Sequence, residues 1–92
     1  MKQFVIERDV PGAGKLTAAD LQAISQTSCA VVDSLGKPYE WLHTYVTDDK
    51  LFCVHEAESE DVIREHASKG NFPVTNIFEV KSIIGPQTAT AV

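Results

Sequence analysis

A hairpin pattern in the middle of the chain constrains its fold more than any other feature. Residues 39–47 and 51–56 are rich in aromatic and β-branched side chains, and Asp48-Asp49 between them is a turn signal. A helical pattern lies on either side of this hairpin, and a further strand pattern lies beyond each helix. The sequence therefore predicts the element order β-α-β-β-α-β.

Each predicted helix begins at a side chain that can cap it and ends at a glycine. These boundary residues are Thr17 and Gly36 for the first helix, and Ser59 and Gly70 for the second. Asp20 completes a capping-box arrangement with Thr17. With outer strands at residues 4–8 and 74–84, right-handed crossovers put strands one and three in the middle of the sheet. We therefore predict a ferredoxin-like α+β sandwich, a four-stranded antiparallel sheet with two helices on one face.

Length and charge restrict the organisation and the partners. The 92 residues suit one domain, which we expect over residues 1–86, followed by a loose tail over 87–92. The formal net charge is -5 and no lysine or arginine cluster stands out, so we expect neither nucleic acid nor a membrane surface as a partner. No apolar span suggests a signal peptide, and the two cysteines form no motif, which favours the cytoplasm.

The hairpin predicts which side chains share a face of the sheet. With Asp48-Asp49 as a two-residue loop, Tyr45 opposes Phe52, His43 opposes Val54 and Trp41 opposes Glu56. The opposite face then carries a smaller set that suits the helix-covered side, namely Leu42, Thr44, Val46, Leu51, Cys53 and His55. A slip of one residue would exchange the two faces, so the choice between His43 and His55 for the open face stays open. Because an uncovered aromatic face is unusual for a monomer, we expect a second copy to cover it.

Three polar residues suggest a metal site on the open face. We expect strands one and three to be parallel neighbours, so Glu7 and Glu56 should lie at one end of the sheet and converge with His43 near Trp41. Two carboxylates and an imidazole are ligands for a divalent transition metal. His66 on the second helix is a further candidate that could reach the sheet edge. The alternative is that the glutamates are solvated strand ends and that His43 is a structural residue.

The segments FVIERDVPGAGKLTAADLQAIS, YEWLHTYVTDDKLFCVHEA and IREHASKGNFPVTNIFEV together resemble the bacterial domain-of-unknown-function family 4242 over residues 2–84. The resemblance implies a cytoplasmic homodimer of the dimeric α/β-barrel type, whose two sheets face each other around a cavity. Some members of that family are described as nickel-binding. Their motifs correspond here to His43 with Tyr45, to Cys53, to Glu56-Ala57 and to His66.

Three functions follow from these observations. The first is a homodimer that binds a divalent metal, nickel among the candidates, through His43, Glu56, Glu7 and His66. The second is a dimeric-barrel enzyme for a small apolar or aromatic molecule, with Trp41, Tyr45 and Phe52 as its pocket. The third is a structural dimer without a ligand. No Ser-His-Asp order or paired-carboxylate spacing identifies catalytic residues, so binding is favoured over catalysis.

Overall fold

The elements follow the predicted order. The computed structural model describes residues 1–90 and contains β1 (Lys2–Asp9), α1 (Ala18–Leu35), β2 (Tyr39–Val46), β3 (Lys50–Ala57), α2 (Glu60–Gly70) and β4 (Asn76–Glu79). Short 3-10 helices lie at Ala13–Lys15 and Pro86–Thr90. In the described part of the chain, no helix is long and apolar enough to cross a lipid bilayer.

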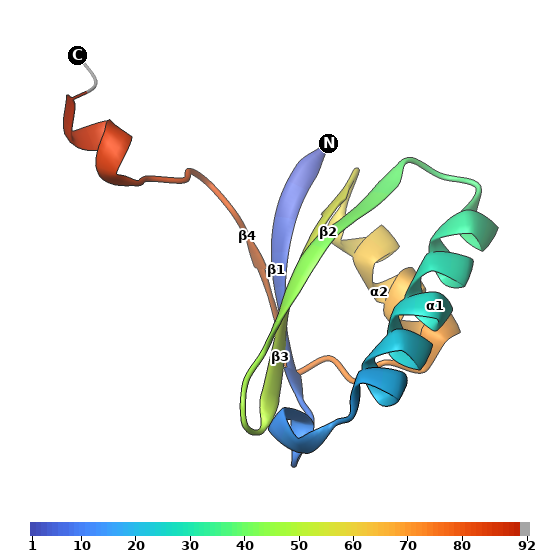
Figure 1. Ribbon diagram of the computed structural model, residues 1–92. Helices are drawn as coiled ribbons and strands as arrows, with labels where there is room; N and C mark the ends of the chain where they lie inside the picture. Colours follow the sequence, from blue (N-terminus) through green and yellow to red (C-terminus); the bar gives the residue numbers. More distant parts are fainter. Residues whose placement is uncertain (91–92) are drawn as a thin grey trace.

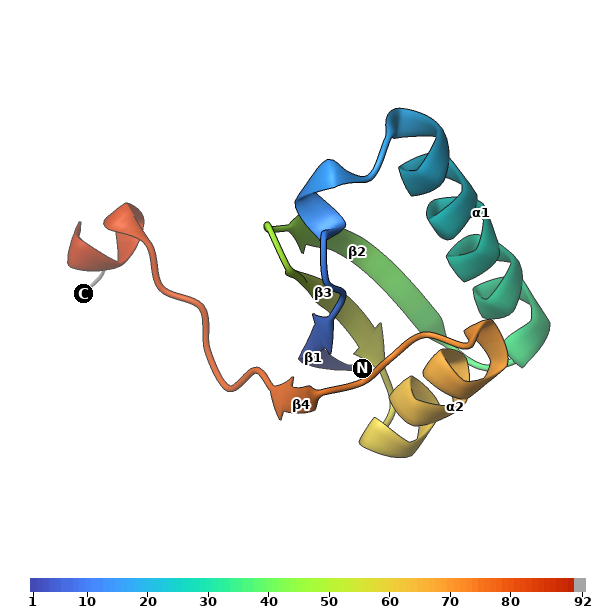
Figure 2. The same cartoon turned by 90° about the horizontal axis from the view of Figure 1, so that it is seen from below.

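The four strands form one sheet in the order β2-β3-β1-β4, and every neighbouring pair is antiparallel. Both helices cover the same face, and the other face is left open (Figures 1 and 2). The predicted α+β sandwich and its central strands one and three are confirmed. The expectation that these two strands run parallel is wrong. The crossover through α1 gives β2 the direction of β1, and the hairpin then reverses β3.

Both helices span the predicted ranges, although Ser59 makes no side-chain capping hydrogen bond at the start of α2. The Thr17 hydroxyl accepts a hydrogen bond from the Asp20 N–H, and the Asp20 carboxylate accepts one from the Thr17 N–H, which completes the capping box before α1. Gly36 ends α1 in the left-handed conformation, at φ 64°. The last residue of α2 is Gly70, after which Asn71 is left-handed.

The core fills the space between the helices and the covered face. Alternate residues of β1 and β3 and the inward face of α2 supply most of it, so each of these strands has one mainly buried side. Its most deeply buried apolar members are Phe4, Ile6, Ala57 and Ile63. The same alternation directs Arg8 into the interior beside Phe4 and Ile6.

A β-bulge in β2 changes which side chains share a face. The predicted loop is confirmed, since the Thr47 N–H donates to the Lys50 carbonyl, and Tyr45 opposes Phe52 as expected. The register shifts between Trp41 and His43, so Trp41 opposes His55 rather than Glu56. The prediction for Trp41 is therefore wrong. Leu42 is the extra residue of the bulge, and it reverses the alternation for every residue that precedes it.

The last strand is shorter than the predicted 74–84. The Val80 N–H donates to the Gln3 carbonyl, and β1 begins only one residue before Gln3, so residues beyond Val80 have no strand left to pair with. From there the chain runs away from the sheet (Figure 1) with Ile83 and Ile84 exposed. Within the expected tail over 87–92, residues 87–90 belong to a 3-10 helix, and residues 91 and 92 lie outside the described residues.

Candidate functional site

The open face of the sheet is apolar at its centre. Its aromatic members are Tyr45, Phe52 and Phe78, with Val5 and Val54 between them. Tyr45 is 61% exposed and Phe78 is 55% exposed. The His43 ring packs edge-on against Tyr45, with the ring centroids 4.9 Å apart. The predicted aromatic open face is thus present, although Trp41 is not part of it.

Glu7 and Glu56 lie toward opposite ends of this face. Glu7 pairs with Phe52 while Glu56 pairs with Gln3, a separation of four residues along β1, or about 13 Å. The predicted convergence of the two carboxylates with His43 is therefore wrong, because it assumed parallel strands. Glu7 also has partners of its own. Lys50 donates to it at 2.6 Å and the Asn76 amide at 2.8 Å, and the Lys50 contact is the main cause of a lowered pKa at Glu7.

The bulge brings a different carboxylate opposite Glu56. Glu40 is its Cα partner across the hairpin, and His43 lies three residues further along β2 on the same face. Directly opposed carboxylates repel each other, so a bound cation would be favourable between them. No sequence signal marked Glu40, since its face depends on the bulge. Among residues 1–90, no three His, Cys, Asp or Glu side chains of one copy are grouped closely enough to hold a metal ion.

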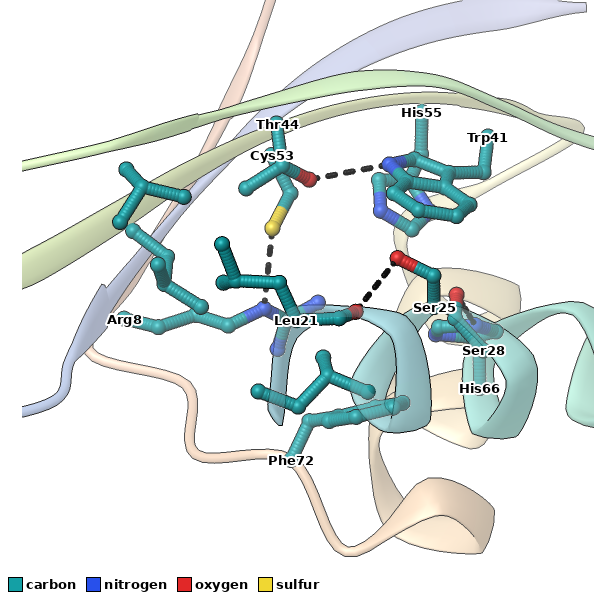
Figure 3. Close-up of a pocket in the computed structure, with 13 residues that line it drawn as sticks. Arg8, Leu21, Ser25, Ser28, Trp41, Thr44, Cys53, His55, His66 and Phe72 are labelled. Atoms are coloured by element: carbon teal, nitrogen blue, oxygen red, sulfur yellow. Dashed lines mark hydrogen bonds between the residues drawn. The ribbon is translucent and has the colours of Figure 1, made fainter. Parts of the chain in front are cut away.

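A cavity of about 160 Å³ lies on the covered face, between α1, α2 and the sheet (Figure 3). Its polar and aromatic lining comprises Arg8, Trp41, Cys53, His55, His66 and Phe72. Apart from Ser28, which is buried, the lining residues from α1 and β2 are partly or largely exposed, whereas Arg8, Cys53, His55 and His66 are buried. The cavity therefore opens between α1 and β2, and the charged and imidazole groups form its floor.

Two buried histidines meet at this floor, with ring centroids 5.1 Å apart. Tyr39 Oη lies 2.6 Å from His55 Nδ1, and Ser28 Oγ lies 3.1 Å from His66 Nε2. The His66 ring stacks with both Tyr39 and Phe72. In the described residues, His66 Nδ1 is the one buried side-chain nitrogen or oxygen without a hydrogen-bond partner.

Burial determines the protonation of these groups. Together with a smaller effect of the nearby Arg8 charge, it lowers the pKa of His55 to about 3 and that of His66 to about 4. Both imidazoles are therefore neutral at pH 7. Burial also raises the pKa of the Tyr39 phenol well above its usual value, so Tyr39 keeps its proton. In the described residues its hydroxyl has no other hydrogen-bond partner, so we infer that it donates that proton to His55 Nδ1. The remaining His55 nitrogen, Nε2, then carries the ring proton.

Arg8 is the site residue that sequence reasoning missed, and its place in register with Phe4 and Ile6 was the available signal. It is only 2% exposed. Its Nε donates to Cys53 Sγ at 3.4 Å and its Nη1 to the Pro73 carbonyl at 2.8 Å. The guanidinium carbon lies 5.4 Å from the centroid of the Phe72 ring. The cavity thus contains a fixed positive charge.

The cavity does not fit a divalent metal ion. Neutral imidazoles are good nickel ligands, and His55 and His66 supply two of them. However, the Arg8 cation lines the same space, and no aspartate or glutamate of the described chain lines it to offset that charge. His66 also lies on the opposite face of the sheet from His43, so the two cannot share an ion within one copy.

Comparison with known proteins supports a specific family. A family model described as "Nickel responsive protein SCO4226-like" matches residues 4–80. The structure is similar to the crystal structure of SCO4226 from Streptomyces coelicolor A3(2), with a TM-score of 0.76 and 15% sequence identity, over 89% of this chain and 99% of that chain. At this identity the likeness shows the fold alone. No curated protein matches the sequence.

Proposed function

Because the chain belongs to the SCO4226-like family of nickel-responsive proteins, we propose that it is a homodimer, joined through its open sheet face, that binds nickel or another divalent transition metal there. The observation that carries this proposal is the apolar open face, with His43 inside it and opposed carboxylates at one end. The free thiols of Cys29 and Cys53 are compatible with the cytoplasm, where we place the protein.

A second copy is the cover that the open face requires. Two large aromatic side chains, Tyr45 on edge strand β2 and Phe78 on edge strand β4, remain more than half exposed, and apolar residues of the two central strands lie between them. Contiguous apolar surface of this kind is typical of an interface core, where aromatic residues are enriched. A twofold dimer would bury both copies of this surface against each other.

The proposed ligands are His43, Glu40 and Glu56. Imidazole and carboxylate together suit nickel, and all three side chains belong to the open face. Within residues 1–90, one copy does not group three donors within reach of an ion, so the proposal needs donors from the second copy. Glu7 is not among the proposed metal ligands because its carboxylate accepts hydrogen bonds from Lys50 and Asn76. His66 is not among them because it is buried on the helix-covered side of the sheet.

The dimer is tested by light scattering after size exclusion. We expect the wild type to be a dimer and Phe78→Glu to be a monomer, because the new carboxylate would be buried without a partner. Ile84→Glu is the matched control, since Ile84 is also an exposed apolar residue but lies outside the sheet. A wild type that is monomeric at about 100 µM would contradict the proposed interface.

The metal is tested by calorimetric titration of metal-free protein with nickel. We expect His43→Ala and Glu56→Gln to lose binding and Glu58→Gln, a nearby exposed carboxylate outside the strands, to retain it. The Phe78→Glu monomer should bind nickel more weakly than the wild type. A wild-type dissociation constant above about 100 µM, equivalent to about 5.5 kcal/mol, would leave the structural dimer as the better account.

A further inference from the structure

The cavity on the covered face is separate from the proposed metal site, and its chemistry is different. We propose that it binds a small apolar carboxylate, whose carboxyl group pairs with Arg8 and whose hydrocarbon part lies between Trp41 and Phe72. This inference does not rest on the proposed function, because none of its residues belongs to the open face.

The first support is a buried cation without a counter-charge. Arg8 takes part in none of the ion pairs of residues 1–90. Its two contacts, a carbonyl oxygen and a sulfur atom, use two of the five N–H donors of a guanidinium. A buried arginine is rare unless it is paired, since a lone charge is costly to remove from water. An anionic ligand in the cavity would supply the missing charge.

The second support is the shape that Arg8 presents to the cavity. Figure 3 shows its side chain extending from β1 across the site, with Cys53 on one side and Phe72 on the other. The aromatic ring and the Pro73 carbonyl hold the planar fork in place. A guanidinium fork binds a carboxylate through two parallel hydrogen bonds, which makes a carboxylate the best matched anion.

The third support is a second donor at the same floor. Tyr39 donates to His55 Nδ1, which leaves the ring proton of the neutral imidazole on Nε2, and His55 lines the cavity. Because both imidazoles are uncharged at neutral pH, they add polarity without adding positive charge. The cavity thus offers one full charge and one neutral donor, which suits a monoanion.

The remaining walls restrict the rest of the ligand. Leu21, Ile24, Leu51 and Val46 line the cavity with Trp41 and Phe72, so most of its surface is apolar. A volume of about 160 Å³ is similar to that of an engineered apolar cavity that holds benzene. The ligand class is therefore a short branched or monocyclic carboxylic acid, rather than a phosphate or a polar metabolite.

Titration with benzoate, followed by amide chemical shifts in a heteronuclear spectrum, tests the site on the wild type without metal. We expect saturable shifts at Arg8, Cys53 and His55. Benzyl alcohol, which has nearly the same shape and no charge, should bind about tenfold or more weakly, and so should inorganic phosphate. Equal binding of benzoate and benzyl alcohol, phosphate binding as tight as benzoate, or no saturable shift up to about 10 mM benzoate would each overturn the proposal.

Two variants locate the ligand. Arg8→Gln should weaken benzoate binding about tenfold or more and leave benzyl alcohol binding unchanged. Should that variant not fold, Ser25→Leu gives an independent answer, because Ser25 lines the cavity from its partly exposed α1 side. We expect Ser25→Leu to exclude benzoate and Gln26→Leu, its exposed neighbour on α1, to leave binding unchanged. Benzoate binding that survives Ser25→Leu would place the ligand elsewhere and overturn the proposal.

Discussion

Tyr39 Oη lies 2.6 Å from His55 Nδ1, and this contact joins the first residue of β2 to a residue of β3 that is almost fully buried. It provides the one donor that the acceptor nitrogen of His55 has within the described chain. The same contact decides which nitrogen of the imidazole is presented to the cavity. Its loss should therefore be measurable both in stability and in binding.

We expect Tyr39→Phe to lower the free energy of unfolding by about 1–3 kcal/mol, because it leaves His55 Nδ1 buried without a donor. Urea denaturation followed by circular dichroism measures this change. Tyr45→Phe is the matched control, since the Tyr45 hydroxyl has no hydrogen bond in residues 1–90 and its ring is exposed. It should change the stability by less than about 0.5 kcal/mol. Equal losses in the two variants would contradict the role assigned to the Tyr39 hydroxyl.

Stability should fall as the pH is lowered from about 6.5 toward 4.5. The folded pKa values of His55 and His66, about 3 and about 4, lie below the unfolded value, so the unfolded chain binds protons that the folded chain does not. The stabilisation is complete above the unfolded pKa and decreases by up to about 1.4 kcal/mol per pH unit for each histidine. Urea denaturation at several pH values measures the slope.

A histidine variant separates this effect from the titration of carboxylates. The lowered pKa values of Glu7, Asp9 and Asp20 put their contribution below about pH 4.5. His66→Gln should therefore reduce the slope between pH 6.5 and 4.5 by up to half. A slope unaffected by that substitution would show that other groups cause the acid sensitivity.

Thr17→Ala should cost about 1 kcal/mol of stability, because it removes the hydroxyl that accepts the Asp20 N–H at the start of α1. Thr27 provides the control within the same helix. Its hydroxyl donates to the Ala23 carbonyl, which already belongs to the helix, and alanine is the better helix former. Thermal unfolding should show Thr17→Ala below the wild type and Thr27→Ala at or above it. The reverse order would contradict the capping role.

Trp41, the only tryptophan of the chain, should report on the cavity and not on the open face. Its indole N–H donates to Thr44 Oγ1 on the helix-covered side. We expect Ser25→Leu to shift its fluorescence emission to shorter wavelength, since the larger side chain displaces water from the cavity. Phe78→Glu should leave the emission maximum unchanged. A shift in Phe78→Glu would mean that Trp41 faces the dimer interface after all.

The element order and the hairpin could be predicted because each depends on local chemistry. The pair Thr17 and Asp20, the left-handed Gly36 and the Asp48-Asp49 loop all act within a few residues of their position in the chain. The alternation of β3 likewise put Cys53 and His55 on the covered face, where the structure has them. In each case the residues that form the feature are also close together in the sequence.

The candidate sites could be predicted less well, for two physical reasons. A β-bulge has no obligatory residue, and Leu42 resembles any strand residue, so nothing indicated that Glu40 rather than Trp41 would oppose Glu56. The directions of the central strands depend on the topology of the whole sheet. These strands are antiparallel, so the assumption that they are parallel placed Glu7 at the wrong end of the sheet relative to Glu56. The cavity around Arg8 depends on how α1 and α2 pack on the sheet, which periodicity does not specify.

The bulge at Leu42 reverses the order in which the residues of β2 alternate between the two faces of the sheet. Before it, Tyr39 and Trp41 are the residues of β2 that face the helices, and after it His43 and Tyr45, at the same spacing of two, face the open side. β3 alternates between the two, so His55 and Glu56 share one peptide unit while bordering separate compartments. A displacement of β3 would move residues of the cavity and residues of the open face together. Only the backbone of β3 would therefore separate a carboxylate in the cavity from a metal on the open face.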